Sequence, residues 1–362
     1  MEIIIKNMNA IELKQHKLSA SKHCFIQTNG KLVDNLTKKY GRQIALKIFD
    51  GVSVESENDF YTVKWGDDPT PGNPRKNTKL WEATQIQNIA VMHNLAPRVY
   101  GLETVFLAEK LRPVQVTELL PTEYDEYQNA LNVYEEVIGL GKKYNFEVAK
   151  ADVSDRDVMC NKLVDFQTFA FTKDYKDKVR EIYCEEGKYG KVYYQDIPEL
   201  EFSGGPRKSD LRIKELGLDK IDFQGKTVWD IGCAGGFFTR YAYSRGAKSV
   251  IGFDMEKPIT AAKHVANYLG FFNLDYEVID LSNPDVLMDR QKPDICFFLS
   301  MNFHIGIPKF LQDCQTVIFE DNDKNTRHNI TLDRPWNVWF KDIKYLGQNT
   351  DHGQKSIHHL SK

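Results

Sequence analysis

The sequence has few of the features that mark secreted, membrane-bound or polyanion-binding proteins. No apolar run approaches the roughly 20 residues of a membrane span, and the opening residues, MEIIIKNMNAIELKQ, lack a signal-peptide layout. The net charge is only −3, so a general attraction to nucleic acid or anionic membrane is not indicated. The six cysteines include no CxxC pair, which favours ordinary reduced thiols over a disulfide framework or a local zinc site. We therefore expect a cytoplasmic protein without a membrane span.

The chain is long enough for two domains. With 362 residues and 41% hydrophobic content it can bury more than one core. Changes in the pattern along the chain predict a first domain over 1–170, a connecting segment over 171–212 and a second domain over 213–362.

A strand, a glycine-rich turn and a helix dominate the second half. Thr227–Ile231 is an apolar run with β-branched residues, which predicts a buried strand. The turn Gly232–Gly236 follows, and apolar residues then recur at helical spacing. A second apolar strand, Ser249–Phe253, ends at Asp254. The stretch is therefore a βαβ unit.

This unit suits a nucleoside-containing ligand. Glycines allow close backbone approach, the new helix offers free N–H groups, and an acid ending the second strand can accept both ribose hydroxyls. The turn resembles the acid-x-Gly-x-Gly-x-Gly motif of class I S-adenosylmethionine-dependent methyltransferases, with Asp230, Gly232, Ala234 and Gly236 in its places and alanine for the middle glycine. The resemblance implies S-adenosylmethionine as cofactor. The residues it implies for cofactor binding are Asp230, Gly232, Ala234, Gly236, Phe237, Asp254, Met255 and Asp280.

Two other interpretations of the turn stay open. A dinucleotide oxidoreductase uses the same turn for a pyrophosphate. Asp230 disfavours it, because an acid at the strand end suits the cationic amino-acid part of S-adenosylmethionine and would repel a pyrophosphate. The other alternative is a plain α/β turn that binds no ligand.

The remaining second half predicts a Rossmann-like, seven-stranded α/β sheet. Further strands are expected over 274–279, 294–300 and 316–319, with Val338–Phe340 and Ile343–Leu346 as a closing antiparallel pair. In the methyltransferases that the chain resembles, an acid at the position of Asp280 commonly meets the adenine amino group.

The acceptor is less defined than the cofactor. His304 follows the fourth strand, where functional groups of doubly wound sheets gather, and it is a candidate general base for a hydroxyl or a histidine that positions the loop. Arg207 and Arg212 are candidates for binding an anionic substrate or are surface arginines. A glycan, a lipid-linked sugar or a small phosphorylated metabolite is the first expectation, and RNA is the second.

The first half predicts an α+β domain. The pattern predicts a hairpin of two strands over 44–49 and 60–65, then a helix over 79–95. Two further strands over 98–104 and 113–119 and a helix over 125–143 follow. With the residues at its key places, this order resembles the protein-kinase-like fold. Lys64 stands where the strand lysine would be, and Glu82 is its expected ion-pair partner on the helix.

The kinase resemblance also implies a nucleotide site. Asp152 and Asp157 have the catalytic-loop spacing, and Asp165–Phe166 resembles the DFG segment. These places imply ATP on Lys64, Mg²⁺ on Asp157 and Asp165, and an acceptor hydroxyl near Asp152. A Gly-rich loop before Lys64, an asparagine at 157 and a glycine at 167 are missing. The domain is thus expected to be a working kinase, a degenerate one, or a module that recruits substrate.

Overall fold

The computed structural model describes residues 24–27, 29–49, 62–63, 78–107, 110–121, 125, 127–148, 157–166, 169–185, 195–203, 205, 207–280, 282–321, 336–348 and 355–362. The chain divides into two compact units, Met1–Lys178 and Val179–Lys362. None of the helices in the described ranges combines the length with the apolar character that crossing a bilayer requires. The three-part division expected from the sequence stays a prediction.

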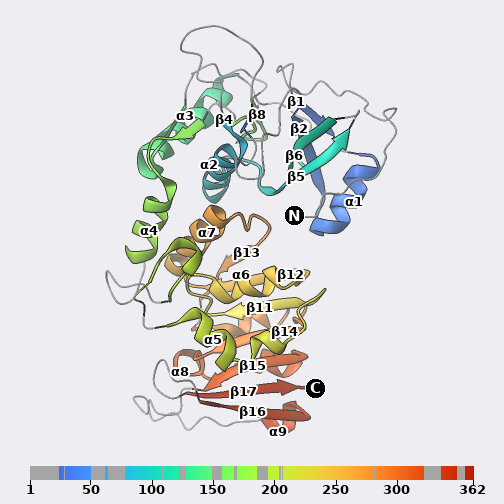
Figure 1. Ribbon diagram of the computed structural model, residues 1–362, viewed down its shortest axis with the longest axis vertical. Helices are drawn as coiled ribbons and strands as arrows, with labels where there is room; N and C mark the ends of the chain where they lie inside the picture. Colours follow the sequence, from blue (N-terminus) through green and yellow to red (C-terminus); the bar gives the residue numbers. More distant parts are fainter. Residues whose placement is uncertain are drawn as a thin grey trace. The chain divides into compact units, whose positions relative to one another are not determined.

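The first unit is built on a four-stranded antiparallel sheet with the order β1-β2-β6-β5 (Figure 1). Its helices are α1 (Lys31–Tyr40), α2 (Leu80–Met92) and α3 (Tyr127–Tyr144), and α4 (Tyr175–Glu185) crosses the boundary between the units. Its strands are β1 (Cys24–Gln27), β2 (Ile44–Phe49), β3 (Thr62–Val63), β4 (Thr78–Lys79), β5 (Val99–Leu107), β6 (Lys110–Glu118), β7 (Phe146–Val148), β8 (Val158–Met159), β9 (Lys162–Leu163) and β10 (Phe169–Phe171).

The predicted elements of this unit are found, but β1, α1 and β4 were not predicted. The expected hairpin of 44–49 with 60–65 is wrong for the described residues, because β2 pairs with β1 and β6 whereas Thr62–Val63 pairs with β4. The strand over 44–49 and the helices over 79–95 and 125–143 coincide with β2, α2 and α3 within a few residues. Every residue of β2 is buried, and Leu46 and Ile48 pack with Val33 of α1. Whether this arrangement is kinase-like stays a prediction.

The second unit contains a seven-stranded, mostly parallel sheet with the order β13-β12-β11-β14-β15-β17-β16. Its strands are β11 (Thr227–Ile231), β12 (Ser249–Asp254), β13 (Asp275–Val278), β14 (Ile295–Leu299), β15 (Thr316–Asp321), β16 (Asp342–Gln348) and β17 (Ser356–Ser361). Its α-helices are α5 (Ser209–Glu215), α6 (Phe237–Ser244), α7 (Glu256–Leu269), α8 (Asn302–Ile305) and α9 (Trp336–Trp339), with 3-10 turns η3 (Pro198–Leu200), η4 (Leu218–Lys220), η5 (Pro284–Leu287) and η6 (Lys309–Asp313). This architecture fits a Rossmann-like methyltransferase, as the sequence predicts.

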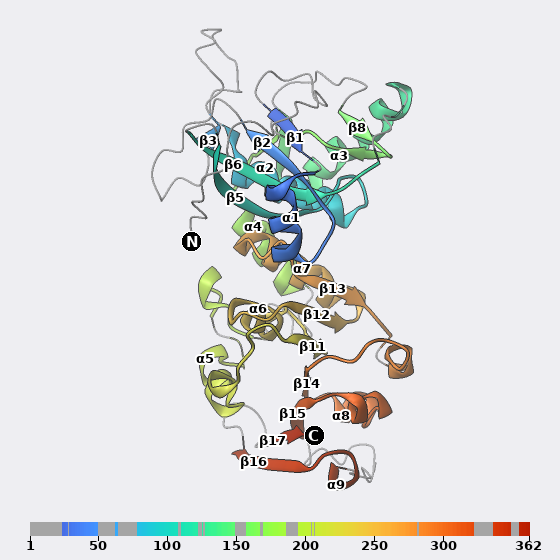
Figure 2. The ribbon, with the colours of Figure 1, turned by 90° about the vertical axis from the view of Figure 1, so that its right-hand side faces the viewer.

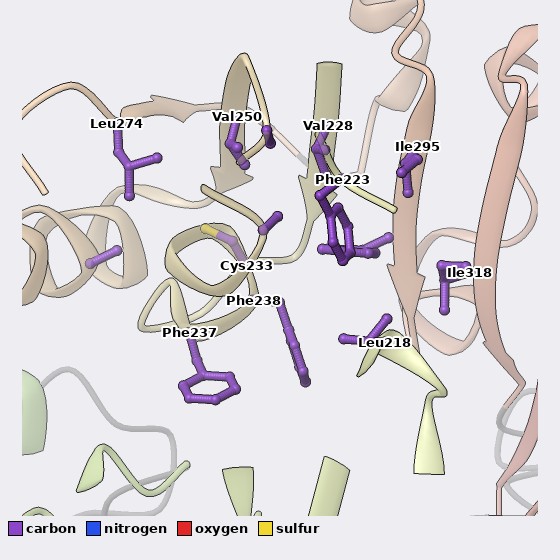
Figure 3. Packing of buried hydrophobic residues seen from close by; sticks show 14 of the residues in the cluster. Leu218, Phe223, Val228, Cys233, Phe237, Phe238, Val250, Leu274, Ile295 and Ile318 are labelled. Carbon is purple, nitrogen blue, oxygen red and sulfur yellow. The ribbon is translucent and has the colours of Figure 1, made fainter. Parts of the chain in front are cut away.

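Alternate residues of the central strands face two separate cores. On one face Val228 packs in the core that contains Phe238 of α6 (Figure 3). Ile259 of α7 belongs to the same core. Trp229 packs with Phe310 of η6 on the other face. Figure 2 shows α5 and α8 on opposite sides of the strands. Because side chains alternate along a strand, this pattern also decides which face each polar residue of β11 meets.

The predicted closing strand pair is wrong in its first member. Val338–Phe340 lies at the end of helix α9, whereas the last antiparallel pair is β16 with β17. Trp336 and Phe340 are four residues apart, and both are buried and pack in the core that contains Phe319. That helical spacing outweighs the β propensity of an aromatic, β-branched run.

Candidate active site

The glycine-rich turn that follows β11 has a left-handed backbone conformation at three positions. The φ angles are +75° at Gly232, +48° at Ala234 and +72° at Gly236. The backbone N–H groups of Gly232 and Cys233 both donate to the Phe253 carbonyl of β12, at 2.8 and 3.1 Å. The turn is therefore tied to the neighbouring strand, and Gly236 caps the N-terminus of α6. Ala234 adopts a positive φ where the resembling motif has a glycine, which costs about 1–2 kcal/mol for an L-residue.

Asp254 links the end of β12 to this turn. One carboxylate oxygen, Oδ2, accepts the backbone N–H of Ala234, and Oδ1 accepts that of Met255, both at 2.8 Å. Burial raises the pKa of Asp254, and the two N–H donors oppose that rise. A carboxylate has about four acceptor sites, so two lone pairs remain for further donors. This is the arrangement needed to accept two neighbouring hydroxyls, as a ribose presents them.

The turn is also closely backed by side chains. A Cβ added at Gly236 would lie 2.6 Å from the Tyr276 hydroxyl, and one at Gly232 would lie 2.2 Å from the Met301 sulfur. Met301 follows β14, so the turn of β11 and the end of β14 are in contact. The ends of these two neighbouring strands form one edge, where ligands of doubly wound sheets bind.

Gly236→Ala tests the packing of the turn. The added methyl group meets both a positive φ and the Tyr276 ring, so we expect a loss of about 2–4 kcal/mol in the free energy of unfolding. Gly225→Ala is the matched control, because Gly225 has φ +70° and nothing within 4 Å of the new Cβ. Urea unfolding measures both variants. Equal losses would mean that φ alone, and not the packing under the turn, accounts for the cost.

Exposed apolar residues lie beside Asp254 at this edge. Met255 is 59% exposed, and Val278, the register partner of Asp254 on β13, is 54% exposed. Asp280 follows β13; its Oδ1 accepts the N–H and the hydroxyl of Ser282, which lower its pKa. An apolar surface next to a fixed carboxylate suits a flat base such as adenine.

Asp230 and Phe237, like Asp254, are buried. Asp230 is 2% exposed, and its Oδ2 accepts the Thr239 hydroxyl at 2.7 Å. Phe237 is 8% exposed and packs edge-to-face on Phe238 (Figure 3). Both residues therefore support the turn from below.

Arg207 and Arg212 are buried, so the expectation that they are surface arginines is wrong. Each is 3% exposed, and both meet Glu320 at the end of β15. Arg212 Nη1 is bonded to Glu320 Oε1, and Arg207 Nη2 lies 4.0 Å from Oε2. Although burial raises the pKa of Glu320, the charges of Arg212, Arg207 and Lys355 bring it down to about 2. Glu320 is therefore an ionised carboxylate inside the fold.

This ionic cluster continues to the end of β14. The hydroxyl of Ser300, a residue with φ +60°, donates to Glu320 Oε2 and accepts from Lys355 Nζ at 2.8 Å. The next residues form the short helix α8, whose His304 is exposed. His304 thus lies at the predicted edge of the sheet. The sequence analysis did not predict Ser300 or Lys355 as part of this cluster. The only sequence signal for them is their position next to the end of a strand.

In the first unit, Asp165 lies next to Lys47, a lysine that the sequence analysis did not consider. Lys47 of β2 is 9% exposed, and its Nζ lies 3.1 Å from the Val164 carbonyl and 3.4 Å from Asp165 Oδ1. The Val164 N–H donates to the Asp157 carbonyl at 2.8 Å, so Asp157 and Asp165 lie at the same end of the β8–β9 hairpin.

The other predicted nucleotide residues of this unit lie elsewhere. Lys64 and Asp152 lie outside the described residues. Glu82 of α2 accepts the Phe171 backbone N–H of β10. The signal for Lys47 was available in the sequence, since Ile44-Ala45-Leu46-Lys47 resembles the Val-Ala-Ile-Lys strand of kinases more closely than Val63-Lys64 does.

The fold and the turn define a class I, Rossmann-like methyltransferase domain. A model of the FtsJ-like methyltransferase family matches residues 214–297, which include the turn, Asp254 and β14. This match covers part of the second unit and supports an S-adenosylmethionine-dependent methyltransferase there. A search of curated proteins finds no match.

Several solved structures resemble the chain at low identity. The bifunctional kinase-methyltransferase WbdD is 20% identical with a TM-score of 0.40, over 51% of this chain and 46% of that one. The magnesium protoporphyrin IX methyltransferase ChlM from Synechocystis PCC 6803, with bound SAH, is 17% identical with a TM-score of 0.33, over 42% of this chain and 82% of that one. A ribosomal protein L11 methylase from Lactobacillus delbrueckii subsp. bulgaricus is 18% identical with a TM-score of 0.29, over 42% and 78%. The similarity to WbdD therefore spans less than half of that protein.

Proposed function

We propose that the second unit binds S-adenosylmethionine on the 232–236 turn and transfers its methyl group to an acceptor at the adjoining end of β14. The observation that carries this proposal is the double role of Asp254, which fixes the turn through Ala234 and keeps acceptor sites for two ribose hydroxyls. Met255 and Val278 supply the apolar surface for the base, with Asp280 beside it for the adenine amino group.

The bound donor supplies an electrophilic methyl group on a sulfonium sulfur. The chain orients it, because the turn is tied to Phe253 and Asp254 and cannot shift without losing those hydrogen bonds. Met301 backs Gly232 closely, so this side of the turn is filled and excludes water. We assign to His304, exposed on α8, the acceptance of a proton from an incoming hydroxyl.

For the acceptor, we retain a glycan, a lipid-linked sugar or a small phosphorylated metabolite, with RNA second. Arg207 and Arg212 are neutralised in part by Glu320, so they do not by themselves form a phosphate site. Incubation with methyl-labelled donor and cell extract fractionated by polarity measures where the label goes. Label in the RNA fraction alone would overturn the preference for sugars and metabolites.

Calorimetric titration of the full chain tests the donor. We expect S-adenosylmethionine and S-adenosylhomocysteine to bind and NAD not to bind, because Asp230 lies under the turn where a pyrophosphate would sit. Binding of NAD without binding of either methyl-donor ligand would contradict the proposal and favour the dinucleotide alternative.

A second candidate function belongs to the first unit, where Lys47 and Asp165 favour a nucleotide site. A buried ammonium beside a carboxylate and close to Asp157 can hold phosphate oxygens and a Mg²⁺ ion together. We propose that this unit binds Mg²⁺-ATP through Lys47, Asp157 and Asp165, in place of the Lys64 site expected from the sequence. The alternative stays a module that recruits substrate without a nucleotide.

Lys47→Met is the test of this second function. We expect Mg²⁺-ATP affinity to fall by about 10- to 100-fold, the value of one charged hydrogen bond. Lys39→Met is the control, because Lys39 is an exposed lysine of the same unit that pairs with Glu103. Fluorescent-nucleotide titration gives both affinities. Absence of Mg²⁺-ATP binding by the wild type, or equal affinity in the two variants, would reject the site and favour the recruiting module.

A further inference from the structure

A buried carboxyl group and a buried arginine, Asp230 and Arg240, both lie next to the donor turn. Asp230 shares the face of β11 with Val228, so its carboxylate points toward α6. From α6, Thr239 donates its hydroxyl to Asp230, and the next residue, Arg240, is 3% exposed. Arg240 Nη1 donates to the Gly235 carbonyl at 2.7 Å. The arginine therefore holds the turn itself while its charge acts on Asp230.

The charged and titratable groups that face Asp230 come from every element around it. Arg240 of α6 favours its ionised form, whereas Asp254 at the end of β12 disfavours it. Cys233 of the turn, Cys296 of β14 and Tyr276 of β13 are the other titratable neighbours, and burial raises the pKa of all three. Those three groups are therefore neutral at physiological pH, and Asp254 and Arg240 are the charged neighbours that act on Asp230, after burial and the Thr239 hydrogen bond and with the smaller effect from Arg240.

The protonated and ionised forms of Asp230 are close in free energy near neutral pH. Burial, opposed by the Thr239 hydrogen bond and aided by the charge of Asp254, raises the pKa of Asp230 from 3.8 to about 7. Near neutral pH, a further charge brought to the turn can therefore change the protonation of this carboxyl group. A cation shifts it toward the carboxylate, and a neutral ligand leaves it as it is.

We propose that Asp230 and Arg240 form a charge sensor beneath the turn, by which the chain distinguishes the sulfonium donor from the neutral thioether product. This inference rests on the proposed binding of S-adenosylmethionine at the 232–236 turn. Asp230 and Arg240 are positioning residues here, since the sensor acts through the turn and makes no contact with the methyl group. Binding of the cationic donor shifts Asp230 to its carboxylate form, and the proton goes to solvent. After methyl transfer the sulfonium charge is gone, so Asp230 favours its protonated form again and takes up a proton from solvent. Product release is then coupled to proton uptake.

Linkage gives the sign and the size of the effect. Ligand binding that releases a proton strengthens as the pH rises through the pKa of the group in the free protein. For one proton released from Asp230, the affinity for the donor rises about tenfold between pH 6 and pH 8. The product lacks the sulfonium charge, so its affinity changes by about threefold or less over the same range.

Calorimetric titrations with S-adenosylmethionine and S-adenosylhomocysteine at pH 6, 7 and 8, in buffers of different ionisation enthalpy, measure affinity and proton release together. We expect the wild type to release protons with the donor and fewer with the product. Asp230→Asn should release none and should bind the donor with the same affinity at all three pH values. Equal pH dependence of donor and product in the wild type would overturn the sensor while leaving the proposed function intact, whereas binding of neither ligand would overturn both.

Variants of the arginine keep the proposal testable if Asp230→Asn does not fold. Arg240→Gln removes the cation, so the rise in donor affinity should move to higher pH. Arg240→Lys retains the charge and should restore most of the wild-type midpoint. Arg245→Gln, at the exposed C-terminal end of the same helix, is the matched control and should leave the midpoint unchanged. Identical midpoints in Arg240→Gln and Arg245→Gln would reject the sensor.

Discussion

Arg212→Met is expected to lower the free energy of unfolding by about 3–5 kcal/mol, because it leaves the charge of Glu320 buried without its main partner. Glu320 is fully buried, and Arg212 and Arg207 contact its two oxygens. A hydrophobic side chain of similar length keeps the packing but not the charge. The expected loss is therefore electrostatic and not that of a cavity.

The control for this variant is Lys208→Met, four residues earlier in the chain. Lys208 is half exposed and pairs with Asp196 at 2.9 Å, and such surface pairs contribute about 0–1 kcal/mol. Urea unfolding of both variants measures the difference. A loss in Arg212→Met no larger than that in Lys208→Met would show that the Glu320 pair does not stabilise the fold.

The pH dependence provides a second readout for the same pair. The folded-state pKa of Glu320, about 2, lies below its ordinary value of 4.5. The stability that the pair contributes is therefore present above pH 4.5 and is lost as the pH falls toward 2. We expect the stability difference between wild type and Arg212→Met to be constant from pH 5 to 7 and to narrow below pH 4.5. If the stability difference between wild type and Arg212→Met stays the same below pH 4.5, the lost stability comes from packing and not from the charge pair.

Local pattern was sufficient to predict the part of the site that is continuous in sequence. The strand at 227–231, the turn, the helix from Phe237 and the acid at 254 all follow within about one βαβ unit, where hydrophobic period and glycine placement determine the structure. The family model matches this same stretch. The methyl-donor class could thus be inferred before the fold was known.

The rest of the site depends on contacts between distant residues. Arg212 and Glu320 are 108 positions apart, and each alone is typical of a solvated surface. Lys47 and Asp165 are 118 positions apart, and the order of elements does not indicate which strand faces the β8–β9 hairpin. Composition and periodicity carry no information about such pairs. The folded chain brings them together, Arg212 of α5 with Glu320 of β15 and Lys47 of β2 with Asp165 after β9.

The aromatic segment before the last strands illustrates a different limit. Val338–Phe340 has the composition of a strand, and single-segment propensity favours it. The deciding interaction is tertiary, since Trp336 packs on Phe319 of β15 and on Phe340 one helical turn later. The strand that replaces it, β17, contains two histidines, and His359 Nε2 lies 2.8 Å from the Leu216 carbonyl. Its place in the sheet is therefore supported by a contact that no local pattern indicates.

Asp254→Ala is expected to weaken S-adenosylmethionine binding by about 100-fold or more. In the proposed site, the variant removes two hydrogen bonds that the ribose hydroxyls donate to the carboxylate, each worth about 1.5–3 kcal/mol, and it also leaves the Ala234 N–H without its acceptor. S-adenosylhomocysteine shares the ribose, so its affinity should fall by a similar factor. The loss is thereby distinguished from the charge effect expected at Asp230, which separates donor from product.

Asp222→Ala is the matched control for Asp254→Ala. Asp222 also accepts a backbone N–H, that of Gln224 at 3.0 Å, but it precedes β11 and so lies at the opposite end of the strand from the turn. Asp222→Ala should therefore leave the affinities for S-adenosylmethionine and S-adenosylhomocysteine unchanged within about twofold. Calorimetric titration gives the affinities, and thermal unfolding without ligand shows whether each variant is folded. A folded Asp254→Ala protein that binds the donor as tightly as Asp222→Ala does would place the ribose elsewhere, and with it the cofactor site.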